Sequence, residues 1–255
     1  MAYQRVIHRL KKGVEVEDYH SNRYGAPGEE RQKKKKATPE QMARQNQYQK
    51  EKKARHKLME HFEENDYFSL LTYRREARPP DMKTAKKQFS EFMKVVRREY
   101  RKRGVEVKWL RNIEVGTKNG WHVHLIINRI PDTDIILKMA WEYGKTVNQL
   151  LYEWGGFVKL AAYITKTPQT DSRLKETSYS ASRNLPVPPP EKYTYLRWKT
   201  WNKEHLRIPK GHYLDKESFH EGRNRVTGHP YRRYIALKIP DKDSRKQRRD
   251  TPGGE

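Results

Sequence analysis

"VEVKWLRNIEVGTKNGWHVHLIIN" (residues 105–128) consists of two largely apolar runs separated by a short stretch rich in Gly and Asn. Each run is long enough for a strand, and an Asn-Gly pair between two such runs is a signal for a β-hairpin. The second run carries His122 and His124, which would point to the same face because side chains alternate along a strand. The sequence therefore predicts a hairpin with two adjacent imidazoles.

Further elements are predicted on both sides of this hairpin. "YFSLLTY" (67–73) is rich in aromatic residues and is typical of a buried strand. From Asp81 to Arg103, apolar residues recur every three or four positions, which predicts an amphipathic helix that stops at Gly104. Three elements are predicted after the hairpin, namely a short helix at 132–144, a strand at 145–154 and a helix at 155–167. Together they predict an α+β domain with a central antiparallel sheet and flanking helices, roughly over residues 62–170.

The charge of the chain points to a polyanionic partner. Among 255 residues, Lys and Arg total 56 against 32 acidic residues, and the formal net charge is +24. Such an excess favours nucleic acid, through phosphate contacts and counterion release. A solvated basic surface, or a basic tail on an unrelated domain, is the alternative. Hydrophobic residues make up 34% of the chain, so we expect a core in only part of it.

Composition also excludes several classes of protein. The chain has no cysteine, which excludes disulfides and thiolate zinc sites and fits a reducing intracellular compartment. No apolar run approaches the roughly 20 residues that span a bilayer, and the first 20 residues lack the apolar core of a signal peptide. No P-loop motif of a helicase is present. We therefore expect a soluble, cytoplasmic protein without a membrane partner.

Both ends of the chain are predicted to be basic extensions. Residues 1–37 are polar and interrupted by Gly and Pro, and we expect them to be disordered. Residues 38–64 predict a basic helix that lies on the surface or on a partner. Residues 188–240 contain a Pro-rich connector and an extension in which basic residues mix with Tyr and Trp, and residues 241–255 predict a disordered tail.

Glu114 adds a carboxylate to the two imidazoles. It lies on the first strand of the hairpin, and pairing across the turn would bring it beside His122 and His124. Two imidazoles and a carboxylate with open positions suit a divalent cation such as Mg²⁺ or Mn²⁺, which can polarise a phosphoryl oxygen. Two histidines on a half-exposed strand, with a salt bridge from Glu114 to Lys108 or Lys118, are the alternative.

Tyr163 and Lys166 form a second candidate pair, three residues apart in "YITK". On a helix they would share a face. A tyrosine hydroxyl has a pKa near 10 and is a poor nucleophile unless a cation favours its phenolate, and Lys166 could supply such a charge. The alternative is an amphipathic helix with Tyr163 packed inward and Lys166 exposed.

Basic residues and aromatic residues are candidates for contacts with DNA. A protein that grips single-stranded DNA interleaves cations with aromatic rings on which bases stack. The basic face of the helix at 81–103 and the Lys33–Lys36 run are expected to touch phosphate, although a solvated face remains possible. The candidates on the helix and in the C-terminal extension are Lys86, Lys94, Arg97, Arg98, Arg101, Trp198, Lys199 and Trp201.

The order of these motifs resembles that of a known superfamily. "YFSLLTY", then a Glu and "WHVHLII", then "YITK" is similar to the three motifs of HUH endonucleases, specifically single-tyrosine initiators of rolling-circle replication. "MAWEYG" (139–144) and "SRNLP" (182–186) extend the resemblance to replication-associated proteins of Gram-positive mobile elements and small single-stranded DNA phages. The resemblance covers residues 38–187. It implies an HUH nuclease domain at 65–187 with an RRM-like palm.

The resemblance also implies a reaction and its participants. His122, His124 and Glu114 would hold Mg²⁺ or Mn²⁺ on the scissile phosphate, and Tyr163 would attack that phosphate to give a 5′-phosphotyrosine and a free 3′-OH. Lys166 would assist the tyrosine or neutralise the phosphate. Further residues that could contact DNA on the strength of the resemblance alone are Arg183 and Asn184.

The implied partners are single-stranded or hairpin origin DNA and a host helicase and polymerase, in the cytoplasm of a bacterial host that carries a plasmid, phage or integrative element. Two other functions stay open. A single-tyrosine HUH transposase would share the histidines, although a Gln typically stands where this chain has Lys166. A non-catalytic DNA-binding protein would explain the basic surface alone.

Overall fold

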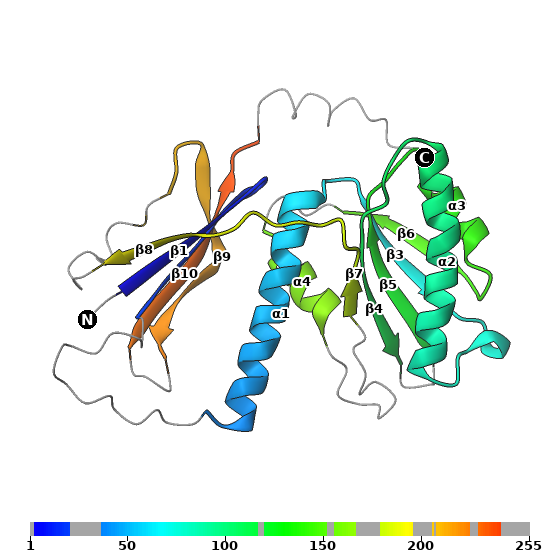
Figure 1. Cartoon of the computed structure of the whole chain (residues 1–255), viewed down its shortest axis with the longest axis horizontal. Helices are drawn as coiled ribbons and strands as arrows, with labels where there is room; N and C mark the ends of the chain where they lie inside the picture. Colours follow the sequence, from blue (N-terminus) through cyan, green and yellow to red (C-terminus); the bar gives the residue numbers. More distant parts are fainter. Residues whose placement is uncertain are drawn as a thin grey trace. The chain divides into compact units, whose positions relative to one another are not determined.

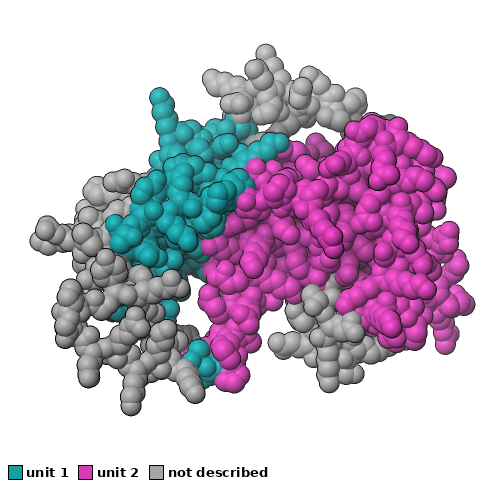
Figure 2. Space-filling view, in the orientation of Figure 1, with its two compact units in different colours: residues 1–38, 188–255 teal, residues 39–187 magenta. Residues whose placement is uncertain are grey.

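The protein is an α+β molecule with two antiparallel five-stranded sheets and, in its described part, four α-helices, as the sequence predicts for its fold class. The computed structural model describes residues 3–20, 37–116, 120–151, 156–166, 179–195, 206, 208–224 and 229–240. The chain divides into two compact units, shown in different colours in Figure 2. Unit 1 consists of Met1–Thr38 and Pro188–Glu255, and unit 2 consists of Pro39–Val187.

The sheet of unit 2 contains the hairpin predicted from the sequence. Its strand order is β6–β3–β5–β4–β7, and all its pairs are antiparallel. The central pair, β4 with β5, runs in register from Trp109 opposite Ile127 to Val115 opposite Trp121. The five strands are β3 (Tyr67–Thr72), β4 (Trp109–Val115), β5 (Trp121–Ile127), β6 (Thr146–Leu150) and β7 (Tyr179–Ala181).

One face of this sheet packs against helices α2 (Met82–Lys102) and α3 (Thr133–Ala140), which lie on the same side of it in Figure 1. The apolar stripe of α2 meets alternate residues of the strands, and each fully buried large side chain contributes roughly 1.5–3 kcal/mol. The carboxylate of Asp81 caps the start of α2 by accepting a hydrogen bond from the backbone N–H of Thr84 (2.7 Å). The buried residues of the stripe are Met82, Ala85, Phe89, Phe92, Met93, Val96 and Tyr100.

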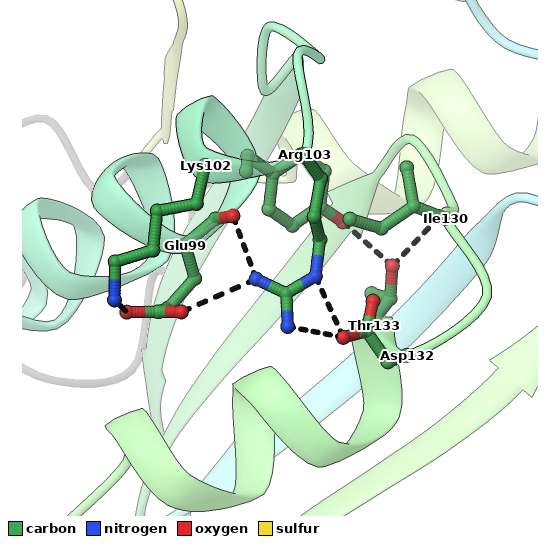
Figure 3. A network of polar contacts seen from close by, with 7 residues as sticks. Glu99, Lys102, Arg103, Ile130, Asp132 and Thr133 are labelled. Carbon is green, nitrogen blue, oxygen red and sulfur yellow. Dashed lines mark hydrogen bonds and ion pairs between the residues drawn. The ribbon is translucent and has the colours of Figure 1, made fainter.

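The end of α2 is held to the turn before α3 by the polar network of Figure 3. Arg103 donates through Nε to the Asp132 carboxylate (2.7 Å) and through Nη1 to the backbone carbonyl of Glu99 (2.8 Å). The hydroxyl groups of Tyr100 and Thr133 lie 2.8 Å apart, and burial raises the pKa of Tyr100. These bonds fix α3, and with it the chain that leaves the end of β5.

The other face of the sheet is covered by α4 (Val158–Thr165), with α1 (Pro39–His61) packed against α4. The sequence predicts a basic helix at 38–64 that lies on the surface or on a partner, and the first half of α1 is indeed largely exposed. Its second half is not, because Ala54, Leu58 and Met59 are fully buried. The few apolar residues of α1 are thus concentrated where they meet the rest of the unit.

Unit 1 contains a second sheet that the sequence analysis does not predict. Its strand order is β8–β1–β2–β10–β9. The prediction of disorder over residues 1–37 is wrong for residues 3–20, which form the first two strands, and the extension at 188–240 supplies the other three. These strands are β1 (Tyr3–Leu10), β2 (Gly13–His20), β8 (Glu191–Tyr195), β9 (His212–Arg223) and β10 (Pro230–Lys238).

The polar composition of these strands conceals a buried ion network. The Asp18 carboxylate accepts two hydrogen bonds from Arg5 (2.7 and 2.8 Å) and one of 3.0 Å from Nη2 of Arg232, and all three side chains are buried. A charged residue is seldom buried unless it is paired, so each of these residues looks like a surface residue in the sequence. The partner Arg232 lies more than 200 positions from Asp18, which keeps the pairing out of any local pattern.

Candidate active site

The candidate active site lies on the sheet face of unit 2 that faces away from α2 and α3. Since side chains alternate along a strand, β5 turns Val123 and Leu125 into the core and His122 and His124 to the opposite face. Glu114 on β4 shares that face. Helix α4 packs next to β4 and brings Tyr163 to the same place.

Glu114 and His124 form a hydrogen-bonded pair, in which Oε2 of Glu114 lies 3.1 Å from Nε2 of His124. In the register of the hairpin Glu114 stands opposite His122, so its side chain reaches diagonally across the pair. The bond to His124 is the main cause that lowers the pKa of the Glu114 carboxyl. In the described residues the ion-pair partner of Glu114 is therefore His124, where the alternative interpretation of the sequence expected Lys108 or Lys118 (the latter lies outside the described residues).

Tyr163 reaches the same imidazole from α4. Its hydroxyl oxygen lies 3.3 Å from Nε2 and 3.5 Å from Nδ1 of His124. The Phe68 ring from β3 stacks on His124 at 5.8 Å and meets the edge of Tyr163 at 6.0 Å. Tyr163 is 43% exposed, so it is not the inward-packed residue of an ordinary amphipathic helix. Burial, and then the charge of Glu114, raise the pKa of its phenol.

His122 is the partly exposed member of the histidine pair, at the end of β5 next to the turn. It stands opposite Thr72 on one side and Glu114 on the other. Burial chiefly, and then the neighbouring His124, lower the pKa of its imidazole. Its buried Nδ1 has no hydrogen-bond partner among the described residues. A Cβ at Gly120 would come within 3.2 Å of its Nε2, so glycine leaves the ring room there.

The donor types of this site suit a divalent cation, although they are not gathered into a cluster. Within the described ranges, no three His, Cys, Asp or Glu side chains are grouped as a metal site. Glu114 and His124 bond to each other, and the ring nitrogen of His122 beside them has no described partner. Two imidazoles and one carboxylate on neighbouring strands are a chemically suitable donor set for Mg²⁺ or Mn²⁺.

Lys166 differs from its predicted placement on a helix face shared with Tyr163. Helix α4 ends at Thr165, and Lys166 is its C-terminal cap, with extended backbone (φ −53°, ψ 127°). Its side chain is exposed, and its charge contributes to lowering the pKa of the Glu114 carboxyl. Lys166 therefore lies near the carboxylate, just beyond the helix that carries the tyrosine.

The comparison with protein families covers this site. Residues 66–168 match the family model of the replication-associated protein ORF2. The matched segment begins just before β3 and ends just after α4, so it includes Phe68, Glu114, both histidines, Tyr163 and Lys166. The match supports a protein similar to replication initiators, which act on DNA. No curated protein and no solved structure matches the chain.

The segment that matches this family also includes the predicted phosphate-binding face of α2, but the fold separates it from the tyrosine. Helix α2 packs on the face of the sheet opposite the histidines. Its basic side chains project from the outer side of that helix, and they are exposed except for the half-buried Lys86. The residues concerned are Lys86, Lys94, Arg97, Arg98 and Arg101. The structure does not bring them together with the candidate active site.

The remaining predicted DNA contacts lie outside the matched segment. Arg183 is exposed. Asn184 donates through its side-chain amide to the Glu106 carboxylate and to the carbonyl of Val107 (both 3.2 Å), so in this structure it anchors "SRNLP" to the chain that enters β4. Three groups of candidates lie outside the described residues, namely Lys33–Lys36, Trp198 with Lys199, and Trp201.

Two buried or half-buried residues of the site are not singled out by the sequence analysis. Phe68 holds the rings of His124 and Tyr163, and Asn112 bonds to the end of α4. A weak signal exists for Asn112, because it lies two residues before Glu114 and therefore shares its face. The equivalent signal for Phe68 is the predicted strand at 67–73, whose facing direction depends on tertiary packing.

In the described part of the chain, no helix has the length and apolar content needed to cross a bilayer.

Proposed function

We propose that the protein is a site-specific DNA-nicking and strand-transfer enzyme that initiates rolling-circle replication through a 5′-phosphotyrosine intermediate. The observation that carries the proposal is the approach of Tyr163 to His124. The phenol oxygen lies 3.3 Å from Nε2 of an imidazole that is itself paired with Glu114. A half-exposed tyrosine beside an imidazole and a carboxylate, in a segment similar to replication-associated proteins, fits a nucleophile next to the groups that assist it.

The proposed reaction balances without a co-reactant. The Tyr163 oxygen forms a bond to the scissile phosphorus, and the bond from phosphorus to the 3′ oxygen of the preceding nucleotide breaks. The phenol loses one proton and the departing 3′ oxygen gains one, so the products are a 5′-phosphotyrosine and a free 3′-OH. Reversal of the same step by a second 3′-OH reseals the strand and restores the tyrosine.

His122, His124 and Glu114 are the residues that would hold Mg²⁺ or Mn²⁺ in this proposal. A divalent cation bound there would polarise the phosphate and favour the phenolate over the phenol. The unpartnered Nδ1 of His122, the Glu114–His124 pair and their position beside Tyr163 support this assignment within the described residues. The Lys166 side chain, whose charge reaches Glu114, would add positive charge near the phosphate.

Two other functions make different predictions for Tyr163. A single-tyrosine transposase would use the same tyrosine but act on the ends of a transposon. A non-catalytic DNA-binding protein would need neither Tyr163 nor a metal. Host helicase and polymerase are the partners that the replication proposal requires, since the chain carries no recognisable P-loop.

The test is the formation of a covalent protein–DNA adduct. We would incubate the purified full-length protein with circular single-stranded DNA of the element that encodes it, with Mn²⁺, and resolve the products on a denaturing gel. We expect an adduct in the wild type and none in Tyr163→Phe or in chelator, because the phenol oxygen is the attacking atom. Tyr213→Phe, which removes the hydroxyl of an exposed tyrosine of unit 1, is the matched control and should form the adduct normally.

Each outcome separates the candidates. An adduct that depends on Tyr163 and on the metal establishes the nuclease, and joining of the bound strand to a new 3′-OH establishes strand transfer. DNA binding by a wild type that never forms an adduct would favour the non-catalytic protein. An adduct on transposon-end sequences alone would favour the transposase.

A further inference from the structure

Asn112 connects the strand that carries Glu114 to the helix that carries Tyr163. Its side-chain Nδ2 donates a hydrogen bond to the backbone carbonyl of Lys166 (2.9 Å). The side chain is completely buried, and in the hairpin Asn112 stands opposite His124. The bond therefore joins β4 to the first residue after α4, directly beside the candidate active site.

This bond fixes a part of the helix that lacks partners of its own. The last carbonyl groups of an α-helix have no intrahelical hydrogen-bond donor, and α4 is only eight residues long. Lys166 follows Tyr163 by three residues, and its N–H bonds to the carbonyl of Tyr163 (3.2 Å). A displacement of the Lys166 carbonyl would thus be passed to Tyr163 through a single turn of backbone.

The choice of an amide at position 112 has a cost that this bond accounts for. Oδ1 of Asn112 is buried and has no hydrogen-bond partner among the described residues, and burial of an unpartnered polar atom is unfavourable. A leucine has nearly the same shape and would avoid that cost. The one hydrogen bond that the side chain makes in the described structure goes to the end of α4, so this bond is the physical reason for the amide.

The second anchor at this end of α4 is weaker. Nε2 of Gln47, on α1, lies 3.4 Å from Oγ1 and 3.5 Å from the backbone oxygen of Thr165, whereas its bond to Glu51 is 2.8 Å long. Distances of 3.4–3.5 Å are beyond the usual range for N–H···O bonds. Asn112 therefore makes the shorter of the two side-chain contacts that hold the end of the helix.

We propose that Asn112 is a positioning residue for the proposed nicking reaction, which holds the C-terminal end of α4 on β4 and so aims the Tyr163 hydroxyl at His124. This inference rests on the proposed function. Asn112 touches neither the DNA nor the reacting atoms. Its loss lowers the rate of the chemical step and leaves the affinity for DNA unchanged.

The test compares Asn112→Leu with the wild type, using an oligonucleotide that carries the origin and single-turnover adduct formation with Mn²⁺. We expect the maximal rate to fall about tenfold or more, since a displacement of about 1 Å can cost roughly 100-fold, while the oligonucleotide concentration at half-maximal rate stays within about twofold. Asn112→Ala removes the same donor with less bulk and should behave alike. Asn148→Leu on β6, another amide of the same sheet, which faces away from α4, is the control and should keep the wild-type rate.

The outcomes separate this inference from the proposed function. A wild type that forms no adduct would remove the proposed function. A normal rate in Asn112→Leu, beside an active wild type, would overturn the positioning role alone. So would a weakened affinity at an unchanged maximal rate, or the loss of a cooperative thermal transition in both variants, because Asn112 would then serve DNA binding or folding.

Discussion

Glu114, His124 and Tyr163 form a chain of polar contacts in which each group changes the chemistry of the next. The hydrogen bond from His124 lowers the pKa of the Glu114 carboxyl, and the resulting negative charge adds to burial in raising the pKa of the Tyr163 phenol. Left to these three residues, the phenol stays protonated at neutral pH. A positive charge at the site is therefore what the proposed attack requires, and His122 is the remaining donor at its edge.

The metal assignment is tested by replacing each histidine separately. His122→Ala and His124→Ala should each lower Mn²⁺-dependent adduct formation by about 100-fold or more, because ligand loss exceeds the roughly 10- to 100-fold effects of residues that only support ligands. Both variants should unfold cooperatively. The initial rate of adduct formation with and without chelator is the measurement, and His212→Ala in unit 1 is the control. Normal nicking by either variant in chelator would contradict the assignment.

At the scale of single elements, the start of α2 gives a prediction that depends on pH. The Asp81 carboxylate accepts the Thr84 N–H bond, which is the main cause that lowers its pKa below the ordinary value of 3.8. A group whose pKa is lowered by folding stabilises the fold above its ordinary pKa and loses that contribution as pH falls through the folded pKa. Asp81→Ala should therefore melt a few degrees below the wild type at neutral pH, with the difference shrinking in acid.

Asp81→Asn is the matched variant for this cap. Asparagine accepts the same hydrogen bond but cannot be ionised, so its melting temperature should lie close to that of the wild type at neutral pH. Thermal melts followed by circular dichroism at several pH values provide the comparison. A difference between Asp81→Ala and the wild type that stays constant down to the lowest pH would show that the carboxylate charge contributes nothing.

The elements predicted correctly from the sequence are those whose partners are close in the chain. The β4–β5 hairpin joins residues at most 18 positions apart, and the stripe of α2 is a pattern within one helix, so both could be read directly. The register then placed Glu114 beside the histidines. The approach of Tyr163 to His124 could not be read, because it depends on how α4 packs on the sheet; only the family resemblance suggested it.

The sheet of unit 1 illustrates the opposite case. β1 pairs with β8, and β2 with β10, across more than 180 positions of sequence. Its interior includes the ion network of Asp18 with Arg5 and Arg232, so the strands lack the apolar alternation that identifies a strand. Polar residues that are buried only because a distant partner neutralises them give no local signal. Residues 3–20 were consequently predicted to be disordered.

At the scale of the whole molecule, the position of the basic residues determines how DNA binding should depend on salt. The exposed cations of α2 lie on the side of the sheet opposite Tyr163, so a strand that occupies the site must pass around the sheet to reach them. A short oligonucleotide around the nick would then be bound without α2, and a longer strand with it. The log of the affinity falls with log salt by about 0.7 for each phosphate neutralised on a single strand.

Replacing Lys94, Arg97 and Arg101 together by alanine tests this geometry. On a long single strand the salt slope should decrease by about 2, because three phosphate contacts would be lost. On a short oligonucleotide the slope and the rate of adduct formation should stay at their wild-type values, since those contacts are out of its reach. Fluorescence anisotropy at several salt concentrations gives the slopes. An equal loss of adduct formation on the short oligonucleotide would mean that the DNA at the nick site contacts α2, and a flat salt dependence of the wild type would mean that the cations of the whole molecule stay solvated when DNA binds.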